Sequence, residues 1–225
     1  MSAKLLCAPS IGSVVRPRVI VNAAMSVDGK IALRDGQRAR LSNEEDVQRV
    51  HRLRGGVDAI LVGVGTVLKD DPKLTVKPEL AADRSPLRIV LDSDGRTPAS
   101  ARVLDGRAPT LIVTSEACDR TFAHADVLRC GKEQVDLGAL LDRLGDRGIR
   151  TLLVEGGSTV IWSFLRAGLV DELKVFVGSL VLGGRSAPTL AGGEGAVSLS
   201  DSIRLSLERS ERLGDGILLE YSVVR

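Results

Sequence analysis

The sequence predicts an α/β protein with a mostly parallel central sheet, helices on both faces and an antiparallel hairpin at the C-terminal end. Two observations predict this class. Short apolar runs alternate with segments of helical character along most of the chain, which is typical of repeated strand–helix–strand units. The last quarter instead contains two strand-like stretches, 203–212 and 216–224, that flank the tight turn Leu213-Gly214-Asp215, the pattern of a hairpin.

The predicted parallel strands are short runs rich in Val, Ile and Leu. Residues 59–62, Ala-Ile-Leu-Val, are the clearest, because a continuous apolar run indicates a strand buried on both faces of a parallel sheet. Alternation of Leu173, Val175 and Val177 with other residues indicates a further strand near the hairpin. The six earlier strands are predicted at 19–23, 58–63, 88–92, 110–114, 126–128 and 151–154.

Three helices are predicted between these strands, at 43–54, 137–145 and 159–167. Ser42 and Glu45 have the spacing of a capping box for the first helix. Asp136 precedes the second helix, and Gly168 is a typical C-terminal stop for the third. Because no linker divides these elements, we predict one domain over residues 17–225, preceded by a loose arm at residues 1–16.

The composition is that of an ordinary globular protein with an aliphatic core. Hydrophobic residues make up 44% of the 225 residues, charged residues 27% and aromatic residues 2%, and the formal charge is +2. This balance argues against a dedicated nucleic-acid surface, and no apolar run reaches the ~20 residues that cross a bilayer. Three cysteines without a close pair favour a cytoplasmic protein without disulfides. The two distant histidines predict no metal site.

Two predicted strands end in glycine turns suited to ligand binding. Gly63 and Gly65 follow one strand, and Gly156 and Gly157 follow another. Ligands of open α/β sheets bind at this carboxyl edge, and bare backbone before a helix lets N–H groups converge on an anion. We therefore predict phosphate binding at Gly156, Gly157 and Ser158, although a need for a sharp turn would explain the same glycines.

The segment after Gly65 places a hydroxyl, Thr66, and two adjacent carboxylates, Asp70 and Asp71, where a cavity can form. Pro72 prevents a long helix from following. The common dinucleotide-binding fingerprint is not met, because the third glycine and the long helix are missing. A solvated turn would also account for the Asp-Asp-Pro run, so both interpretations stay open.

Eight motifs spread from residue 18 to the C-terminal part of the chain form a pattern together. They are RVIV at 18–21, NAAMSVDGK at 22–30, VHRLR at 50–54, LVGVGTVLKDDPKLTVK at 61–77, RIVLDS at 88–93, TLLVEGGST at 151–159, GLVDEL at 168–173 and LGDGI at 213–217. In this order they resemble the reductase family of riboflavin biosynthesis, specifically its stand-alone archaeal and fungal type. The resemblance implies a dihydrofolate-reductase-like fold, NADPH as cofactor, a phosphorylated ribosylaminopyrimidine as substrate and a homodimer.

The resemblance also implies roles for individual residues. Glu155 and Asp70 are candidates for orienting the substrate or moving protons, Arg54 would face the sugar phosphate, and Met25 would wall the reactive face. Arg54 could instead stabilise the end of its helix. The implied cofactor contacts are Ala24, Thr66, Asp70, Leu91, Ser93, Gly156, Gly157 and Ser158. The implied substrate contacts are Arg38, Arg54, Leu74, Lys77 and Glu155, with Lys77 standing where relatives often carry arginine.

The leading hypothesis is NADPH-dependent reduction of the ribosyl side chain of 2,5-diamino-6-ribosylamino-4(3H)-pyrimidinone 5′-phosphate to ribityl. Three alternatives stay open: reduction of the deaminated 5-amino-6-(5-phosphoribosylamino)uracil, reduction of folate-like pterins, and a non-catalytic NADP-binding module. The sequence lacks the zinc signature of a deaminase domain, which favours the diamino compound. The presence of Arg54, Lys77 and Glu155 argues against the non-catalytic module.

Overall fold

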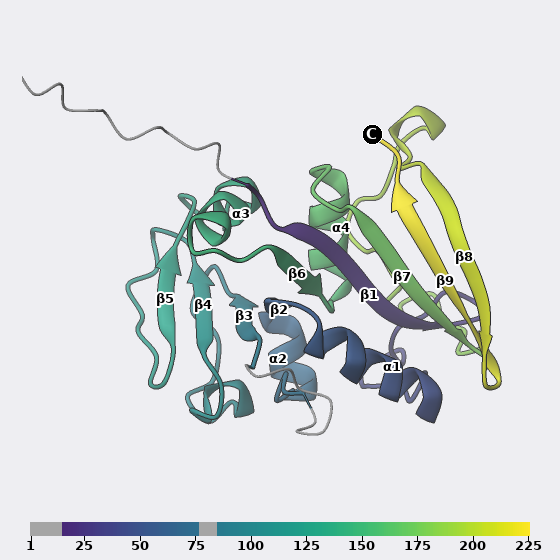
Figure 1. Cartoon of the computed structure of the whole chain (residues 1–225), viewed down its shortest axis with the longest axis horizontal. Coiled ribbons are helices and arrows are strands. Elements are labelled where there is room, and N and C mark those ends of the chain that lie inside the picture. Colours follow the sequence, from purple (N-terminus) through teal and green to yellow (C-terminus); the bar gives the residue numbers. More distant parts are fainter. Residues whose placement is uncertain (1–14, 77–84) are drawn as a thin grey trace, which may run out of the picture.

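A computed structural model of the chain describes residues 15–76 and 85–225; Lys77 and most of the predicted N-terminal arm lie outside these ranges. At its centre is a nine-stranded sheet with the strand order β5-β4-β3-β2-β6-β1-β7-β9-β8 (Figure 1). β1 to β7 pair in parallel, whereas β9 pairs antiparallel with both β7 and β8. The predicted class, with its parallel strands and C-terminal hairpin, is confirmed.

The strands lie close to their predicted positions. The parallel strands are β1 (Arg18–Ser26), β2 (Ala59–Gly63), β3 (Leu87–Leu91), β4 (Thr110–Thr114), β5 (Asp126–Arg129), β6 (Thr151–Val154) and β7 (Glu172–Gly178). The hairpin consists of β8 (Leu205–Leu213) and β9 (Gly216–Val223).

The helices are α1 (Glu44–Gly55), α2 (Val64–Asp70), α3 (Leu137–Asp146) and α4 (Ser158–Arg166), with short 3-10 turns η2 (Arg102–Leu104) and η3 (Leu199–Asp201). Asp136 caps α3 as predicted, accepting from the Ala139 N–H at 2.9 Å. The predicted capping box of Ser42 and Glu45 is wrong. Asn43 caps α1 instead, because its own side chain accepts from the Asp46 N–H at 2.9 Å.

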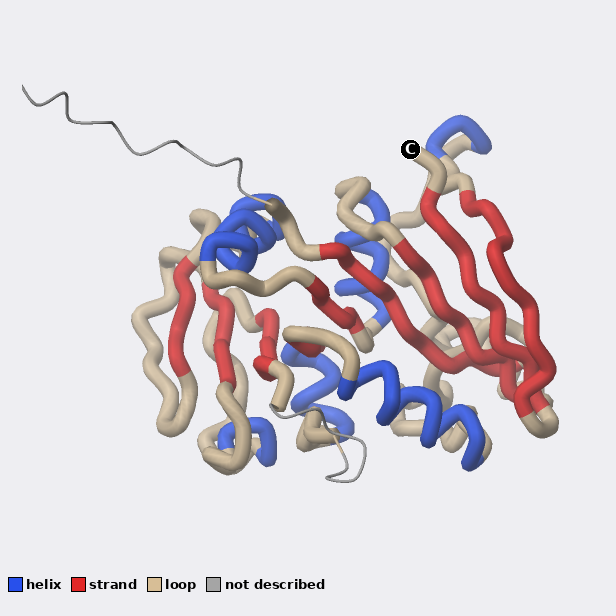
Figure 2. Tube along the Cα trace, in the orientation of Figure 1, coloured by secondary structure: helices blue, strands red, loops and turns tan. Residues whose placement is uncertain are grey.

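Helices cover both faces of the parallel part of the sheet, whereas β8 at the hairpin edge is largely exposed (Figures 1 and 2). Alternate residues of each strand serve opposite faces. Thus Ile60 packs in the cluster that contains Val67 of α2, while Leu61 packs in the cluster that contains Leu140 of α3 and Phe164 of α4. Burying each such side chain contributes roughly 1.5–3 kcal/mol before the entropy of ordering it is subtracted. Among the described residues, no helix has the length and apolar character required to cross a membrane.

The sheet opens at the carboxyl end of β6. β1 pairs with β6 only from Arg18 to Val21, and from Asn22 onward it pairs with β7 alone. The chain leaves β1 toward β2 on one side of β6, and it leaves β6 toward β7 on the other. Ligands of open α/β sheets bind at such a switch point, so the fold itself places a site at the end of β6.

The turn after β1 has a structural role. The Asp28 carboxylate accepts from the Ser26 hydroxyl at 2.6 Å and from the Leu182 and Gly183 N–H groups at 3.0 and 2.7 Å. These hydrogen bonds, the one from Ser26 foremost, lower the pKa of Asp28 to about 2. Asp28 therefore ties the end of β1 to the loop that follows β7.

Candidate active site

A cleft of about 1790 Å³ follows the carboxyl edge of the parallel strands. It is lined by residues of β1, β2 and β3, by α1 and α2, and by the turn from β6 into α4. Twelve residues that the sequence analysis singled out line it: Ala24, Arg38, Arg54, Thr66, Asp70, Leu74, Leu91, Ser93, Glu155, Gly156, Gly157 and Ser158. The structure thus brings residues from distant segments into one cleft, and their contacts with ligands stay predictions.

Arg54 and Glu155 form a two-point ion pair inside the cleft. Arg54 donates from Nε to Glu155 Oε1 at 2.7 Å and from Nη2 to Oε2 at 2.6 Å. The two side chains are 20% and 9% exposed. Burial alone would lower the pKa of Arg54, but the charge and hydrogen bonds of Glu155 outweigh it and raise the pKa. Arg54 is thus held as a cation, and within the part of the chain that the structure describes its Nη1 makes only a 3.5 Å contact with the Thr75 carbonyl.

The turn from β6 into α4 is tied to the end of β2. The Gly63 N–H donates to the Gly156 carbonyl at 2.9 Å, and a side chain at Gly63 would approach Val160 to 2.6 Å. Gly156 has φ +120°, a conformation that favours glycine. These two glycines therefore serve close packing and a sharp turn, the alternative that the sequence left open, and in doing so they bring two strand ends together.

The first turn of α4 has open N–H groups next to the predicted phosphate-binding residues, and phosphate binding there stays a prediction. Within the described ranges, the N–H groups of Ser158, Thr159 and Val160 have no hydrogen-bond acceptor, as expected for the first residues of a helix. The Gly157 N–H is already used, because it donates to Thr66 Oγ1 at 3.1 Å. Thr66 accepts that bond and keeps its own hydroxyl proton to donate. The positive end of α4 and three open N–H groups fit a pyrophosphate.

The two adjacent carboxylates that follow Thr66 have different roles. Asp71 has a left-handed backbone, φ +40°, and its side chain accepts from the Arg102 N–H at 2.7 Å, so it anchors the turn. Asp70 lies at the end of α2 and lines the cleft. Burial raises the pKa of Asp70, although the charges of Arg38 and Lys69 oppose the rise. Asp71 thus serves the turn, and the contact of Asp70 with a ligand stays a prediction.

The end of β3 is ordered by a buried carboxylate between the two predicted cofactor contacts. Asp92 is completely buried and accepts from the Thr97 N–H at 2.6 Å and the Thr97 hydroxyl at 2.7 Å. Ser93 Oγ accepts from the Val135 N–H at 3.2 Å. Leu91 and Ser93 are therefore held by their surroundings at the cleft edge.

Two predicted residues have different surroundings from those expected. Leu74 lines the cleft, but it is only 3% exposed, packs in the core beside α2 and has a left-handed backbone at φ +51°. Its contact with a substrate stays a prediction. Met25 is not among the cleft-lining residues and packs against the core cluster that contains Leu140 and Phe164, and its predicted place on the reactive face stays a prediction.

Sequence reasoning missed part of the cleft wall. The Ser158 hydroxyl donates to the Thr189 carbonyl at 2.7 Å, and the Gly192 N–H donates to the Ser158 carbonyl at 3.2 Å. A side chain at Gly192 would approach Ser158 Oγ to 2.4 Å. The glycine pair at 192–193 was the available signal for this contact, because a residue without a side chain allows the close approach. A second missed group is the polar cluster of Asn22, Asp46 and Arg49 on the cleft wall.

Comparisons with known proteins agree with this architecture. The model of the family "RibD C-terminal domain" matches residues 17–219. A 2,5-diamino-6-ribosylamino-4(3H)-pyrimidinone 5′-phosphate reductase of Methanothermobacter thermautotrophicus is 47% identical, over 93% of this chain and 99% of that protein. The enzyme of the same name from Archaeoglobus fulgidus is 42% identical, over 90% and 96%.

Solved structures show the same fold. Acinetobacter baumannii RibD matches with a TM-score of 0.81 at 25% identity, covering 95% of this chain and 60% of the other. Enterococcus faecalis dihydrofolate reductase matches with a TM-score of 0.52 at 12% identity, covering 92% and 97%, which supports the predicted dihydrofolate-reductase-like fold. The relatives' names confirm the predicted class, an oxidoreductase of riboflavin biosynthesis. This chain belongs to the RibD C-terminal domain family.

Proposed function

We propose that this protein is an NADPH-dependent reductase that converts the ribosyl side chain of 2,5-diamino-6-ribosylamino-4(3H)-pyrimidinone 5′-phosphate to ribityl. The observation that carries the proposal is the placement of the Arg54–Glu155 pair and the open N–H groups of α4 in one cleft. The first suits a phosphorylated sugar and the second suits a dinucleotide. The names of the archaeal relatives support the same substrate.

A reductase of this family and fold uses a nicotinamide cofactor, and the residues present fit one. The first turn of α4 and the hydroxyl of Thr66 would hold its pyrophosphate, while Ala24 and Asp70 would lie along the same cleft. When bound, the reduced nicotinamide supplies the hydride for the reaction. The choice of NADPH over NADH is part of the proposal. Arg96 supports it as a 58%-exposed cation near Ser93 at the cleft edge.

The substrate's ribosylamine must open to an imine so that C1′ can accept hydride, and the nitrogen must gain a proton. The chain's contribution is to position the sugar and to move that proton. Arg54 would bind the phosphate with the donors that Glu155 leaves unused. Glu155 would orient the sugar chain or the amine, and Asp70, whose pKa is raised by burial, is the second carboxyl group available for proton transfer.

The proposal extends to the assembly and the compartment. We propose a homodimer that forms through the C-terminal strands, where Leu205, Leu207 and Ile217 are between 39% and 54% exposed. Sedimentation analysis should give twice the mass of the chain. A cytoplasmic location is consistent with the free thiols of Cys118 and Cys130.

The decisive assay is oxidation of NADPH by the purified protein in the presence of the diamino substrate. Absorbance of the reduced cofactor should fall, and the product should carry a ribityl chain by mass spectrometry. Parallel reactions with the deaminated compound and with dihydrofolate test the alternatives, and NADH tests the cofactor choice. Failure to oxidise NADPH with either pyrimidine would refute the proposed function.

A further inference from the structure

Three polar side chains, Asp46, Arg49 and Asn22, form a continuous hydrogen-bonded chain in the cleft wall. Arg49 Nε donates to Asp46 Oδ1 at 2.8 Å, and Arg49 Nη2 lies 2.8 Å from the same oxygen. Arg49 Nη2 also donates to Asn22 Oδ1 at 2.8 Å. The chain therefore links α1, which carries Asp46 and Arg49, to β1, which carries Asn22. Asp46 and Asn22 both line the cleft.

Asp46 is costly to bury in this way. The residue is completely buried, whereas Glu44 and Glu45 in the same helical turn are exposed. Both contacts from Arg49 fall on Oδ1, and the equally buried Oδ2 has no hydrogen-bond partner in the described part of the chain. A buried carboxylate with an unused oxygen loses more hydration than its partner returns. This cost implies that Asp46 has a role, and its contacts with Arg49 indicate that the role is to hold Arg49 in place.

The contact with Arg49 fixes the orientation of the Asn22 side chain at the cleft. A guanidinium group has donors and no acceptor, so the Asn22 side chain must turn its oxygen toward Arg49 and its NH2 group away. Asn22 is 6% exposed, and its NH2 group makes no hydrogen bond with the described residues. The nitrogen is nevertheless not among the fully buried unpaired atoms. Because Asn22 lines the cleft, this nitrogen keeps its access to solvent there as an oriented, unused donor.

The position along α1 indicates which part of the substrate this donor meets. Arg49 precedes Arg54 by five residues, about 7.5 Å along the axis at about 1.5 Å per residue. Arg54 is the proposed phosphate contact, and a pentose separates the phosphate of the substrate from its ring. Because the cleft-lining residues of α1 run from Asp46 to Arg54, near the C-terminal end of the helix, the ring would lie toward the N-terminal half of α1, on the side of Asn22.

We propose that Asp46 and Arg49 are positioning residues, which hold the Asn22 amide so that its NH2 group donates to an acceptor atom of the pyrimidinone ring. The inference rests on the proposed function, because it takes the ring of that substrate as the ligand. Asp46 acts through Arg49, and Arg49 acts through Asn22.

A double-mutant cycle tests this order of action, with the variants Arg49→Met, Asn22→Ala and the combination of both. Each single variant should raise KM for the pyrimidinone substrate about tenfold and leave kcat nearly unchanged, since one hydrogen bond to a ring atom is lost. KM of the double variant should not exceed that of the more impaired single variant, because both substitutions remove the same interaction. Inhibition by ribose 5-phosphate, which has no ring, should stay within about twofold of wild type.

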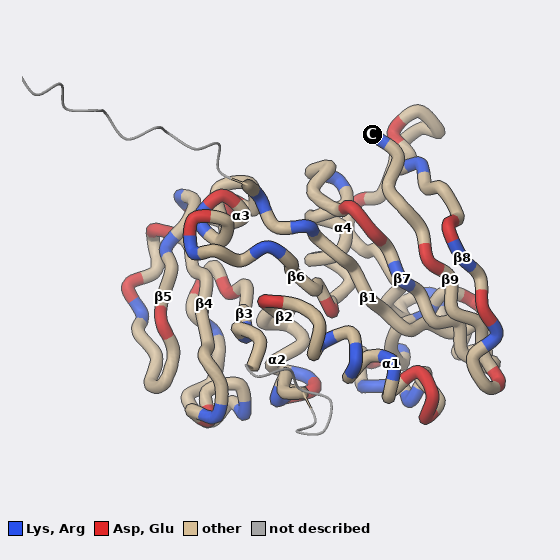
Figure 3. Tube along the Cα trace, in the orientation of Figure 1, with Lys and Arg blue, Asp and Glu red and all other residues tan. Residues whose placement is uncertain are grey.

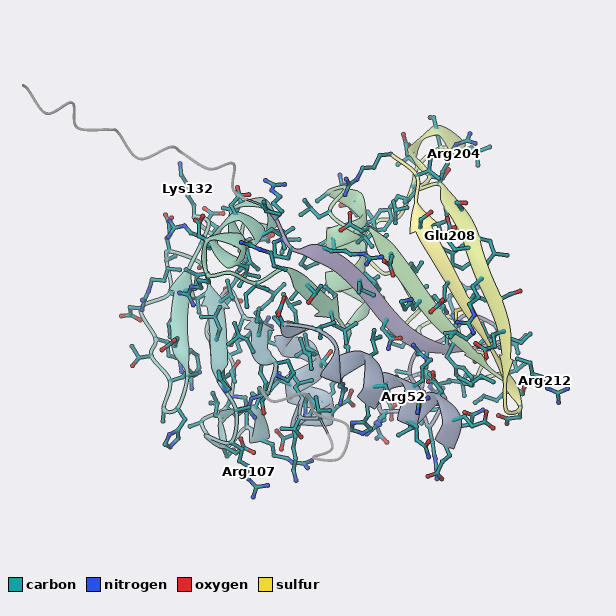
Figure 4. The ribbon with its side chains drawn as sticks, viewed as in Figure 1. Arg52, Arg107, Lys132, Arg204, Glu208 and Arg212 are labelled. Atoms are coloured by element: carbon teal, nitrogen blue, oxygen red, sulfur yellow. The ribbon has the colours of Figure 1, made fainter. Side chains whose placement is uncertain are left out.

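The matched control is Arg52→Met, since Arg52 lies on the same helix, is exposed and does not line the cleft (Figure 4). Additive effects in the cycle, or equal weakening of ribose 5-phosphate, would overturn the inference. If Arg49→Met fails to fold, Asp46→Leu decides, because leucine has a similar size and removes the oxygen that holds Arg49. KM must rise, and an unchanged KM overturns the proposal. If the wild type reduces neither pyrimidine, the proposed function is refuted instead. Calorimetry would then measure binding of the pyrimidinone to the wild type and the same variants, and equal affinity would overturn this inference.

Discussion

Arg88 and Arg54 are both paired with a carboxylate near the central sheet, but their surroundings differ. Arg88 is completely buried and each of its nitrogens is used: Nε donates to Thr110 Oγ1, Nη2 to the Ala108 carbonyl, and Nη1 to Asp105 and the Lys73 carbonyl, at 2.7–3.2 Å. Among the described residues, Arg54 makes its short hydrogen bonds with Glu155 alone, and its Nη1 has only the 3.5 Å contact with the Thr75 carbonyl.

The difference distinguishes an arginine that stabilises the fold from one that can bind a ligand. A cation whose donors are all satisfied by its own chain can stabilise the fold but has nothing left for a ligand. A cation that is fixed at two points and open at a third is oriented in advance for an anion. The exposed charges elsewhere form a third group, in which both signs are interspersed along the trace (Figure 3). Isolated pairs of that kind contribute little to stability.

The largest expected effect on stability is that of Arg88→Met. The substitution leaves Asp105 without its main cation and deprives two carbonyl groups of a donor, so the free energy of unfolding should fall by about 3 kcal/mol. Denaturant titration measures this loss, and activity per folded molecule should be unchanged. Arg107→Met is the control: that side chain is 71% exposed beside the same Asp105 and extends into solvent (Figure 4), so it should cost less than about 0.5 kcal/mol. Equal losses of stability in the Arg88 and Arg107 variants would contradict the structural role of Arg88.

Glu155→Gln should affect activity more than stability. The amide keeps the shape of the side chain but removes the charge that orients Arg54 and the substrate, so kcat/KM should fall at least about 100-fold. Steady-state kinetics on the diamino substrate measures the change. Glu220→Gln is the matched control, because Glu220 forms a 2.6 Å ion pair with Lys174 on β7, outside the cleft. Similar activity in the Glu155 and Glu220 variants would remove Glu155 from the site.

A smaller effect is expected at the link between the two strand ends. Thr66→Val removes the acceptor of the Gly157 N–H, which should cost about 1 kcal/mol of stability and raise KM for the cofactor about fivefold. Thr66→Ser retains the hydroxyl and should behave like wild type in both measurements. A cofactor KM that is unchanged in the valine variant would show that the link does not shape the cofactor site.

The smallest effect concerns Asp28, which lies outside the cleft. Its folded-state pKa of about 2 is below the ordinary value of about 3.9, so it contributes stability that is fully present above about pH 4 and is lost as the pH falls toward 2. Asp28→Asn should therefore reduce the dependence of stability on pH within this window. Unfolding titrations between pH 2 and pH 5 measure the slope. An unchanged slope would show that another carboxylate dominates acid unfolding.

The sequence predicted the elements well where the signal is local. Continuous apolar runs identify β2 and β4, which are buried along their whole length, and the turn at Gly214 identifies the hairpin. α2 was missed because its seven residues are too few to establish a helical period, and α1 begins one residue late because Asn43 competes with Ser42 as a cap.

Contacts between residues far apart in the chain could not be predicted from the sequence. Arg54 and Glu155 are 101 residues apart, and each was assigned separately to the substrate before the structure showed them bound to each other. Asp46 and Arg49 have the i, i+3 spacing of an ion pair on a helix, but nothing in the sequence indicates that Arg49 reaches Asn22 on β1. Lys77 lies outside the described residues, so its predicted contact stays a prediction.

The most direct test of the central claim is a crystal structure of the protein with oxidised cofactor and ribose 5-phosphate. We predict the pyrophosphate at the N–H groups of Ser158, Thr159 and Val160, and the sugar phosphate within hydrogen-bonding distance of Arg54, in the same cleft. A dinucleotide bound away from the first turn of α4, or a sugar phosphate that makes no contact with Arg54, would contradict the account.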